Sequence, residues 1–200
     1  MTSYINWHIP LTSNDIPLQA ALVSLSSVRS ELPGTGAIEQ PDISLISKLA
    51  KTSQSELELF KHIDRQQQDA IHILLGRGLH TMDDIFVTGF TLGSIKKMVK
   101  TEQSVYAFVA KYLVPDICDF NEQEMQVFKD AIRLSFISNC SPLDQFDFND
   151  WLDQPVATIR DAVGIEEELL CAYYAIEKLR NPYNPASQRL LPQEQQVVAF

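Results

Sequence analysis

The side chains of this chain best suited to acid–base or metal chemistry are its four histidines, His8, His62, His72 and His80. His72 and His80 flank a glycine turn, so their imidazoles could meet in space. The sequence lacks the HExxH spacing of a zinc-binding helix, and no cysteine lies within ligand spacing of a histidine. We therefore predict no metal site and no cofactor, and we expect His72 and His80 to have surface or capping roles.

Phosphate and acyl-transfer chemistry also lack their usual patterns. Neither Gly76-Arg77-Gly78 nor the stretch from Gly89 to Gly93 has the glycine spacing and the lysine–serine pair of a phosphate-binding loop. No serine stands in a nucleophile-elbow sequence. Asp83 and Asp84 follow Thr81, which is typical of a helix start, where the helix dipole favours negative charge. The sequence thus predicts a protein that is not an enzyme.

The most unusual segment runs from Pro142 to Pro155 and interleaves acids with aromatics. A calcium loop would need a glycine and a bidentate glutamate at fixed offsets, which the segment lacks. One interpretation is a docking surface, where aromatics are buried against a basic partner and carboxylates steer its approach. The other is an amphipathic turn and helix with the aromatics in the protein's own core. The candidate partner-binding residues are Phe146, Phe148, Trp151, Asp147 and Asp150.

Charge is plentiful but unevenly placed along the chain. The 200 residues include 16 Lys plus Arg and 26 Asp plus Glu, a net charge of −10, which excludes a protein that holds nucleic acid through its overall charge. Residues 1–100 hold nine basic and ten acidic side chains, and residues 101–200 hold seven and 16. If any surface contacts a phosphate backbone, we expect it at Lys96, Lys97 and Lys100, with Arg65 and Arg77 earlier in the same half of the chain. The alternative is a solvated helix face.

Apolar residues recur with helical spacing along most of the chain, and no segment alternates convincingly with a period of two. Asp15 with Pro17 predicts one helix start. Ser53 and Glu56 form a capping box, which predicts a long helix that ends at Gly76. The other predicted helices start at Asp42, Thr81 and Thr91 or cover residues 102–113, 122–138 and 166–180. The fold class is therefore all-α, a bundle of eight or so helices, several of them short.

Three segments resemble one another and begin at Ile46, Ile95 and Ile159. Each predicts a short helix, a polar turn of about three residues and an amphipathic helix, which is the outline of a helix-turn-helix unit. The third copy has Gly164 at the turn. We therefore expect two or three helix-turn-helix-like repeats, which could serve either packing or partner binding.

A helix that reads DNA needs exposed basic or amide side chains near its N-terminal end. The third copy places glutamates there, at 166–168, which a phosphate backbone would repel. The second copy instead has Gln103 and Ser104 beside the lysine cluster. The candidate DNA-binding residues are Lys96, Lys97, Lys100, Gln103 and Ser104.

The stretch from Thr91 to Phe108 resembles the central part of FlhD, a subunit of the bacterial flagellar master regulator. The stretch from Glu58 to Ile63 resembles the N-terminal helix of the same family. The resemblance implies a small, all-α, non-enzymatic bacterial protein that activates transcription only in a hetero-oligomer with a FlhC-type partner. Related pairs control the transfer of conjugative elements.

Composition divides the chain into three regions. Residues 1–115 form an N-terminal helical region with the first two copies, residues 116–180 an acidic helical region with the third, and residues 181–200 an extended tail predicted from its prolines. Three widely spaced cysteines predict buried thiols in a reducing cytosol. Without a signal-peptide pattern or a membrane-spanning apolar run, we predict a cytoplasmic protein.

These observations predict a non-enzymatic transcriptional regulatory subunit that acts in a complex with a DNA-binding protein partner, of the FlhC kind if the resemblance holds. DNA would be contacted only through or with that partner, and no membrane is involved. The alternative is an interaction adaptor or inhibitor that presents the acidic aromatic segment and makes no DNA contact. A second copy of the chain is a further candidate partner.

Overall fold

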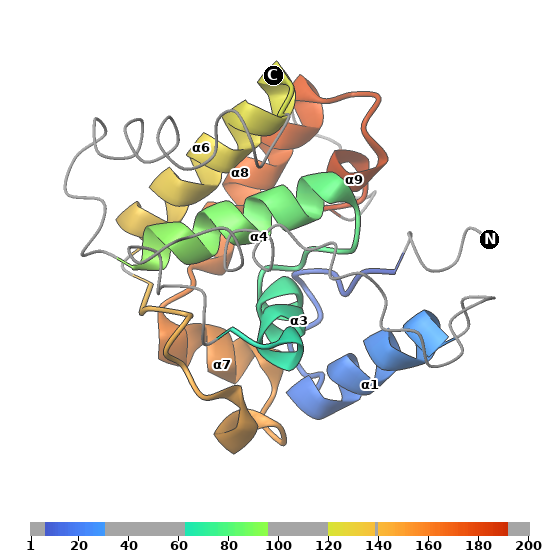
Figure 1. Cartoon of the computed structure of the whole chain (residues 1–200), viewed down its shortest axis with the longest axis vertical. Helices are drawn as coiled ribbons and strands as arrows, with labels where there is room; N and C mark the ends of the chain where they lie inside the picture. Colours follow the sequence, from blue (N-terminus) through green and yellow to red (C-terminus); the bar gives the residue numbers. More distant parts are fainter. Residues whose placement is uncertain (1–6, 31–62, 96–119, 139, 192–200) are drawn as a thin grey trace, which may run out of the picture.

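The computed structural model describes residues 7–30, 63–95, 120–138 and 140–191. Within these ranges the chain is all-α, which confirms the predicted class: it has seven α-helices and no strand. The elements are α1 (Leu18–Ser30), α3 (Arg65–Leu74), α4 (Thr81–Ser94), α6 (Glu122–Ile137), the 3-10 helix η3 (Phe148–Trp151), α7 (Val156–Val163), α8 (Glu167–Arg180) and α9 (Pro185–Gln188) (Figure 1).

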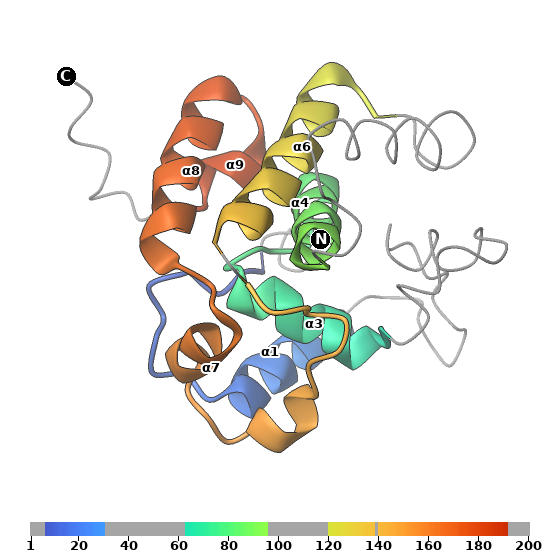
Figure 2. The ribbon, with the colours of Figure 1, turned by 90° about the vertical axis from the view of Figure 1, so that its left-hand side faces the viewer.

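The helices fall into two groups that share a hydrophobic core. Helices α4, α6, α8 and α9 lie together at one end of the molecule, and α1, α3, α7 and η3 lie at the other (Figures 1 and 2). Side chains from both groups are buried in one cluster, among them Leu18, Ile71, Phe86 and Phe128. None of the helices among the described residues is long and apolar enough to cross a membrane.

The largest contact between two helices is that of α4 with α6, and it depends on two glycines of α4. A Cβ atom added to Gly89 would lie 2.7 Å from the carbonyl oxygen of Phe128. A Cβ atom added to Gly93 would overlap the carbonyl oxygen of Ile132. Both obstacles are backbone atoms and cannot swing away. The pair Gly89 and Gly93 therefore lets α4 approach the backbone of α6.

The first described helix, α1, begins at Leu18, directly after the start predicted from Asp15 and Pro17. The first free N–H groups of α1 are satisfied by a distant loop: Leu18 N donates to the Gln154 carbonyl (3.0 Å) and Gln19 N to the Leu152 carbonyl (2.8 Å). This contact ties the N-terminal helix to the segment between η3 and α7.

The predicted helix end at Gly76 is confirmed, but the predicted long helix is not continuous through Ile63 and Asp64. Ile63 and Asp64 are not helical, and Asp64 accepts a hydrogen bond from Gln67 N at 2.8 Å, which makes it the N-cap of a new helix, α3. An aspartate carboxylate competes for backbone donors and favours a helix start over a helix interior. The predicted start at Ser53 lies outside the described residues.

The predicted helix start at Thr91 is also wrong. Helix α4 runs without a break from Thr81 to Ser94, and Ile95 is its C-cap. The Thr91 hydroxyl donates to the Val87 carbonyl one turn earlier (2.8 Å), so it bonds within the helix and does not cap a new one.

The helices predicted over 122–138 and 166–180 are confirmed as α6 and α8. Helix α7 ends at Gly164, whose φ of 77° is in the left-handed region, and α8 follows directly. The third copy of the proposed repeat is thus a helix–turn–helix with Ile159 inside its first helix. The first copy lies outside the described residues, as does the second apart from Ile95, so the repeat itself stays a prediction.

The predicted extended tail is wrong for residues 181–191. Pro185 occupies the first turn of α9, where its missing N–H costs nothing, and Asn184 caps that helix through a 2.9 Å bond to Ala186 N. Ala186, Ser187 and Leu190 are buried. Residues 192–200 and the predicted boundary at 115 lie outside the described residues.

Candidate functional site

The acidic aromatic segment is held in place by hydrogen bonds from α3 and α4. The side-chain Nε2 of Gln67 donates to the carbonyl oxygens of Leu143 and Asp144, at 3.2 Å each. A longer bond of 3.4 Å joins the same nitrogen to the Phe146 carbonyl. From the other side, Leu143 N donates to the Ser94 hydroxyl at the end of α4 (3.1 Å). One amide thus anchors a loop that is about 80 residues away in the sequence.

The three aromatic candidates form a cluster of their own. The ring centre of Phe146 lies 4.9 Å from that of Phe148 and 5.5 Å from that of Trp151. Phe148 is 3% exposed and belongs to the hydrophobic core, while Phe146 and Trp151 are half-buried against it. The core interpretation therefore holds for Phe148, and the surface available to a partner is the exposed part of Phe146 and Trp151.

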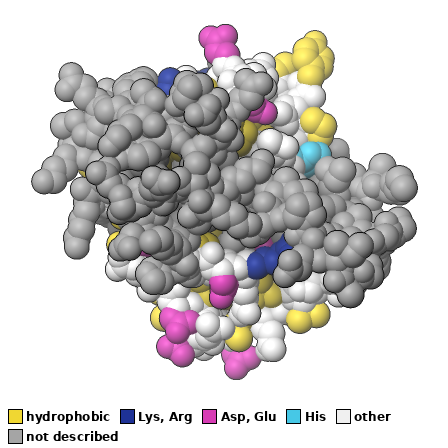
Figure 3. Space-filling view, in the orientation of Figure 1, with side chains coloured by type: hydrophobic (Ala, Val, Ile, Leu, Met, Phe, Trp, Pro, Cys, Tyr) yellow, Lys and Arg dark blue, Asp and Glu magenta, His cyan; other side chains and the backbone are white. Residues whose placement is uncertain are grey.

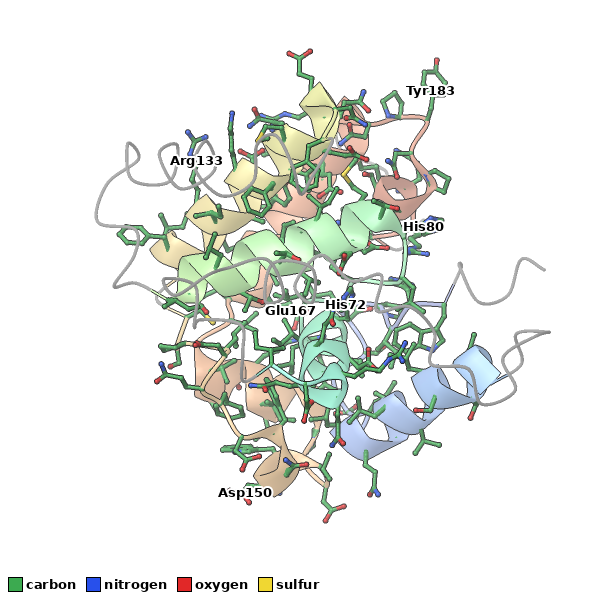
Figure 4. The ribbon with its side chains drawn as sticks, viewed as in Figure 1. His72, His80, Arg133, Asp150, Glu167 and Tyr183 are labelled. Carbon is green, nitrogen blue, oxygen red and sulfur yellow. The ribbon has the colours of Figure 1, made fainter. Side chains whose placement is uncertain are left out.

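The two acidic candidates, Asp147 and Asp150, are exposed. Asp147 Oδ1 accepts hydrogen bonds from Asn149 N (3.0 Å) and Asn149 Nδ2 (2.9 Å), so the carboxylate caps η3. Asp150 projects outward at the end of the molecule where η3 lies (Figure 4), and acidic side chains are prominent on this end in the space-filling view (Figure 3).

A groove of about 390 Å³ lies between this segment and the N-terminal end of α3. Gln66 closes one side through a bond from its Nε2 to Asn149 Oδ1 (3.2 Å). Among the described residues the groove is lined by three aspartates and by no lysine or arginine. Its lining residues are Asp64, Gln66, Gln67, Asp144, Gln145, Phe146, Asp147, Phe148 and Asn149. The arrangement suits cationic side chains with an apolar stem.

The candidate DNA-binding residues cannot be placed in this arrangement. Lys96, Lys97, Lys100, Gln103 and Ser104 all lie in the stretch 96–119, which is outside the described residues.

A second polar cluster, which the sequence analysis missed, is buried beside α4, α8 and α9, and Arg77 at its centre is therefore not part of a phosphate-contacting surface. Arg77 is fully buried and donates to both carboxylate oxygens of Glu177, at 3.0 and 2.5 Å. Its guanidinium carbon lies 3.7 Å from the ring centre of Phe86 and 4.4 Å from that of Tyr174. The Ser187 hydroxyl donates to Glu177 Oε1 (2.9 Å). The Arg77 guanidinium therefore pairs with the Glu177 carboxylate and lies over the rings of Phe86 and Tyr174.

Asp83 extends this cluster to the start of α4. Its carboxylate accepts the backbone N–H of His80 (3.0 Å), lies 3.8 Å from Arg77 Nη1 and pairs with Arg189. Burial by itself would lower the pKa of Arg77, but the Glu177 and Asp83 carboxylates raise it above its ordinary value. The guanidinium therefore stays charged, and the cluster is a set of buried ion pairs.

Arg160 is a second buried arginine, and it joins three segments. Its Nε donates to the Leu74 carbonyl (2.7 Å), and its Nη1 donates to the Leu11 carbonyl (2.6 Å) and Asn14 Oδ1 (2.9 Å). Glu167 Oε2 lies 3.6 Å from the same Nη1. Burial lowers the pKa of Arg160, and Glu167 opposes that effect. The side chain fastens residues 11–14 to α3 and α7.

Three of the four histidines, His8, His72 and His80, lie among the described residues, and His62 lies outside them. His72 is 3% exposed, and its Nδ1 lies 2.8 Å from the Gly78 carbonyl oxygen, so it ties α3 to the turn that follows. His80 is the N-cap residue of α4. Burial, reinforced by Arg189, lowers the pKa of His8 to about 4 and also lowers that of His80. Both rings are therefore neutral at pH 7. The predicted capping role fits His80, whereas the surface-or-capping prediction is wrong for His72, which is buried in the last turn of α3.

The described residues contain no group of three His, Cys, Asp or Glu side chains placed to hold a metal ion. The chain matches no family model, no curated protein and no solved structure. The resemblance to FlhD therefore stays a prediction, and the function has to be argued from the groove and its surroundings.

Sequence reasoning located one wall of the groove and missed the other. Asp64, Gln66 and Gln67 belong to the wall formed by α3. The available signal was Asp64 three residues before Gln67, an N-cap spacing. The long-helix prediction placed Asp64 inside a helix and concealed this signal.

Proposed function

We propose that this protein is a non-enzymatic interaction subunit whose acidic groove binds a basic segment of a partner protein. The observation that carries the proposal is the set of hydrogen bonds from the Gln67 side chain to three carbonyl oxygens of the acidic loop. A surface fixed before binding loses little conformational entropy when a partner arrives.

The groove has the chemistry of a docking site for lysine or arginine. Asp64 and Asp147 are exposed on its two walls, and the half-buried ring of Phe146 also lines it. Carboxylates on the rim attract a cationic partner over several ångströms, while the ring contacts the apolar stem of a long basic side chain. A cavity of about 390 Å³ is at the small end of binding pockets, so it fits a few side chains of a larger partner.

A defined probe tests this proposal directly. A fluorescent amphipathic peptide of alternating lysine and leucine is titrated with the full chain, and a glutamate–leucine peptide serves as the negative control. We expect binding of the lysine peptide only, weakening as salt rises, because exposed charges are screened. Asp64→Asn with Asp147→Asn should weaken binding by about fivefold to tenfold, since each rim charge contributes about 0.2–1 kcal/mol.

Asp153→Asn is the matched control, because Asp153 is exposed in the same acidic segment but does not line the groove. It removes one charge and should leave the affinity nearly unchanged. If Asp153→Asn weakened binding as much as Asp64→Asn alone or Asp147→Asn alone, peptide affinity would depend on net charge only. The proposal would then be wrong.

The second proposal is that the subunit regulates transcription together with a DNA-binding partner. It is favoured by the basic cluster of Lys96, Lys97 and Lys100 in a chain of net charge −10, and by the resemblance to FlhD. The DNA contact would then come from Lys96, Lys97, Lys100, Gln103 and Ser104, and the groove would hold the partner. A gel shift with the partner present tests it: Lys96/Lys97/Lys100→Ala should weaken DNA binding, and unchanged binding would remove DNA contact from the proposal.

A further inference from the structure

Helix α8 carries an apolar stripe on the side that faces away from the core. Ala172, Ala175, Ile176 and Leu179 are exposed along it, and Tyr183 continues the stripe beyond the helix end. Ile176 is 45% exposed, Leu179 73% and Tyr183 96%. Spacings of three and four residues place the four helical residues on one face. The opposite face, with Leu170, Tyr174 and Glu177, is buried.

This stripe is more than scattered apolar exposure. Helix α8 lies at the outer edge of its group (Figure 2), and Tyr183 projects into solvent at its far end (Figure 4). Single exposed apolar residues are normal on a protein surface, but a continuous row on one helix marks an interaction surface.

The charges of α8 identify the occupant. On the exposed side of α8, the first turn carries the acidic Glu168 and the last turn the basic Arg180. A second α8 laid antiparallel on the first would therefore place its basic end over the acidic end of the first, and the reverse. A parallel arrangement would bring like charges together.

The register of such a pair is self-complementary. Ala172 and Ile176 lie four residues apart, and Glu168 and Arg180 lie four residues further out on either side. A twofold axis midway between Ala172 and Ile176 therefore sets Ile176 of each copy against the small Ala172 of the other. The same axis sets Glu168 against Arg180 of the other copy. Glu168 is exposed, and the Arg180 side chain is 54% exposed beside its own Asp130, so both can be reached.

We propose that two copies of this chain pair through the exposed faces of α8 in this antiparallel register. The proposal does not depend on the acidic groove, which lies among other elements. One helix face is small compared with the about 800 Å² per partner of a stable interface, so we expect a dimer of micromolar affinity.

Sedimentation equilibrium of the full chain, from about 1 µM to about 1 mM, tests the proposal. The wild type should show a monomer–dimer equilibrium within this range. Ile176→Glu should weaken dimerisation about tenfold or more, because it puts a carboxylate in the apolar centre of the interface. Val23→Glu is the matched control, since Val23 is 57% exposed on α1, and it should leave the equilibrium unchanged.

A charge exchange tests the register. Glu168→Arg alone and Arg180→Glu alone should each weaken the dimer, and the double substitution should restore it, because opposite charges then face each other again. Circular dichroism checks that each variant keeps its helix content.

A wild type that is monomeric throughout the range would overturn the proposal and leave the stripe to a different protein. A dimer that tolerates Ile176→Glu would place the interface elsewhere, and failure of the double substitution to restore dimerisation would rule out the antiparallel register.

Discussion

Arg77 and Arg160 are the largest fully buried side chains among the described residues, and the fold neutralises them in different ways. Arg77 is matched by the carboxylates of Glu177 and Asp83, and Arg160 mainly by backbone carbonyls, with Glu167 nearby. Removing one partner leaves a buried charge without its counter-charge, so it should cost more than removing both.

We predict that Glu177→Leu lowers the free energy of unfolding by about 3–5 kcal/mol, because it leaves the Arg77 guanidinium buried without its main partner. The double variant Arg77→Met/Glu177→Leu should lose less than the single variant. Urea unfolding followed by circular dichroism measures both.

The comparison variant is Arg180→Ala, which breaks an exposed ion pair with Asp130 (2.9 Å). Such pairs contribute up to about 1 kcal/mol. If Glu177→Leu cost no more than Arg180→Ala, the buried cluster would not be a major stabilising feature of the fold.

His8 makes stability depend on pH in a defined window. Burial, together with Arg189, lowers its pKa in the folded state to about 4 from the ordinary 6.5. As pH falls below about 6.5, His8 becomes protonated in the unfolded state but stays neutral in the folded state. The free energy of unfolding therefore decreases progressively until about pH 4. The His8 ring thus contributes stability that is fully present above pH 6.5.

We predict that His8→Gln flattens the loss of unfolding free energy between pH 6.5 and pH 4, by about 3 kcal/mol over the window. Urea midpoints at several pH values for the wild type and the variant measure this difference. Parallel pH profiles for the two proteins would show that His8 titrates normally in the folded state.

At the scale of the elements, the sequence predicted helices well and their ends less well. The starts of α4 and α6 follow from local chemistry, acids in the first turn or a capping box, and were found. Helix α9 was missed because three prolines argued for an extended tail, whereas Pro185 stands at a helix start, where proline fits. Thr91 was misread because a threonine hydroxyl can cap a helix or bond within one.

Only one wall of the groove could be predicted from the sequence. Its acidic wall is one continuous segment and was visible in the sequence. Its other wall, with Gln66 and Gln67, is brought to the first by tertiary packing across about 80 residues. No local pattern reports such a contact.

The central element-scale prediction concerns Gln67. We expect Gln67→Ala to release the loop 143–146, since it removes the donor that serves three carbonyls. Backbone amides of that loop should exchange hydrogen for deuterium about tenfold faster, because an opening free energy lowered by 1.4 kcal/mol corresponds to a factor of ten. Gln66→Ala, which removes only a bond to Asn149, is the control and should change exchange little. Similar exchange in both variants would show that Gln67 is not the anchor.

At the scale of the whole molecule, two ends of the fold carry different chemistry. The end with α3 and η3 presents the acidic groove, and the end with α6, α8 and α9 presents the apolar stripe of α8. The net charge of −10 supports a role of the acidic groove in binding, because a strongly negative protein attracts basic proteins and repels nucleic acid.

The most direct test of the groove is an NMR titration of the full chain with the lysine–leucine peptide. The side-chain amides of Gln66, Gln67, Gln145 and Asn149 line the groove and give separate signals. We predict that these signals shift first and saturate with the peptide, while those of Gln123 and Gln126, which line a pocket beside α6 and α8, stay in place. Shifts confined to Gln123 and Gln126, or an unchanged spectrum at saturating peptide, would contradict the proposed function.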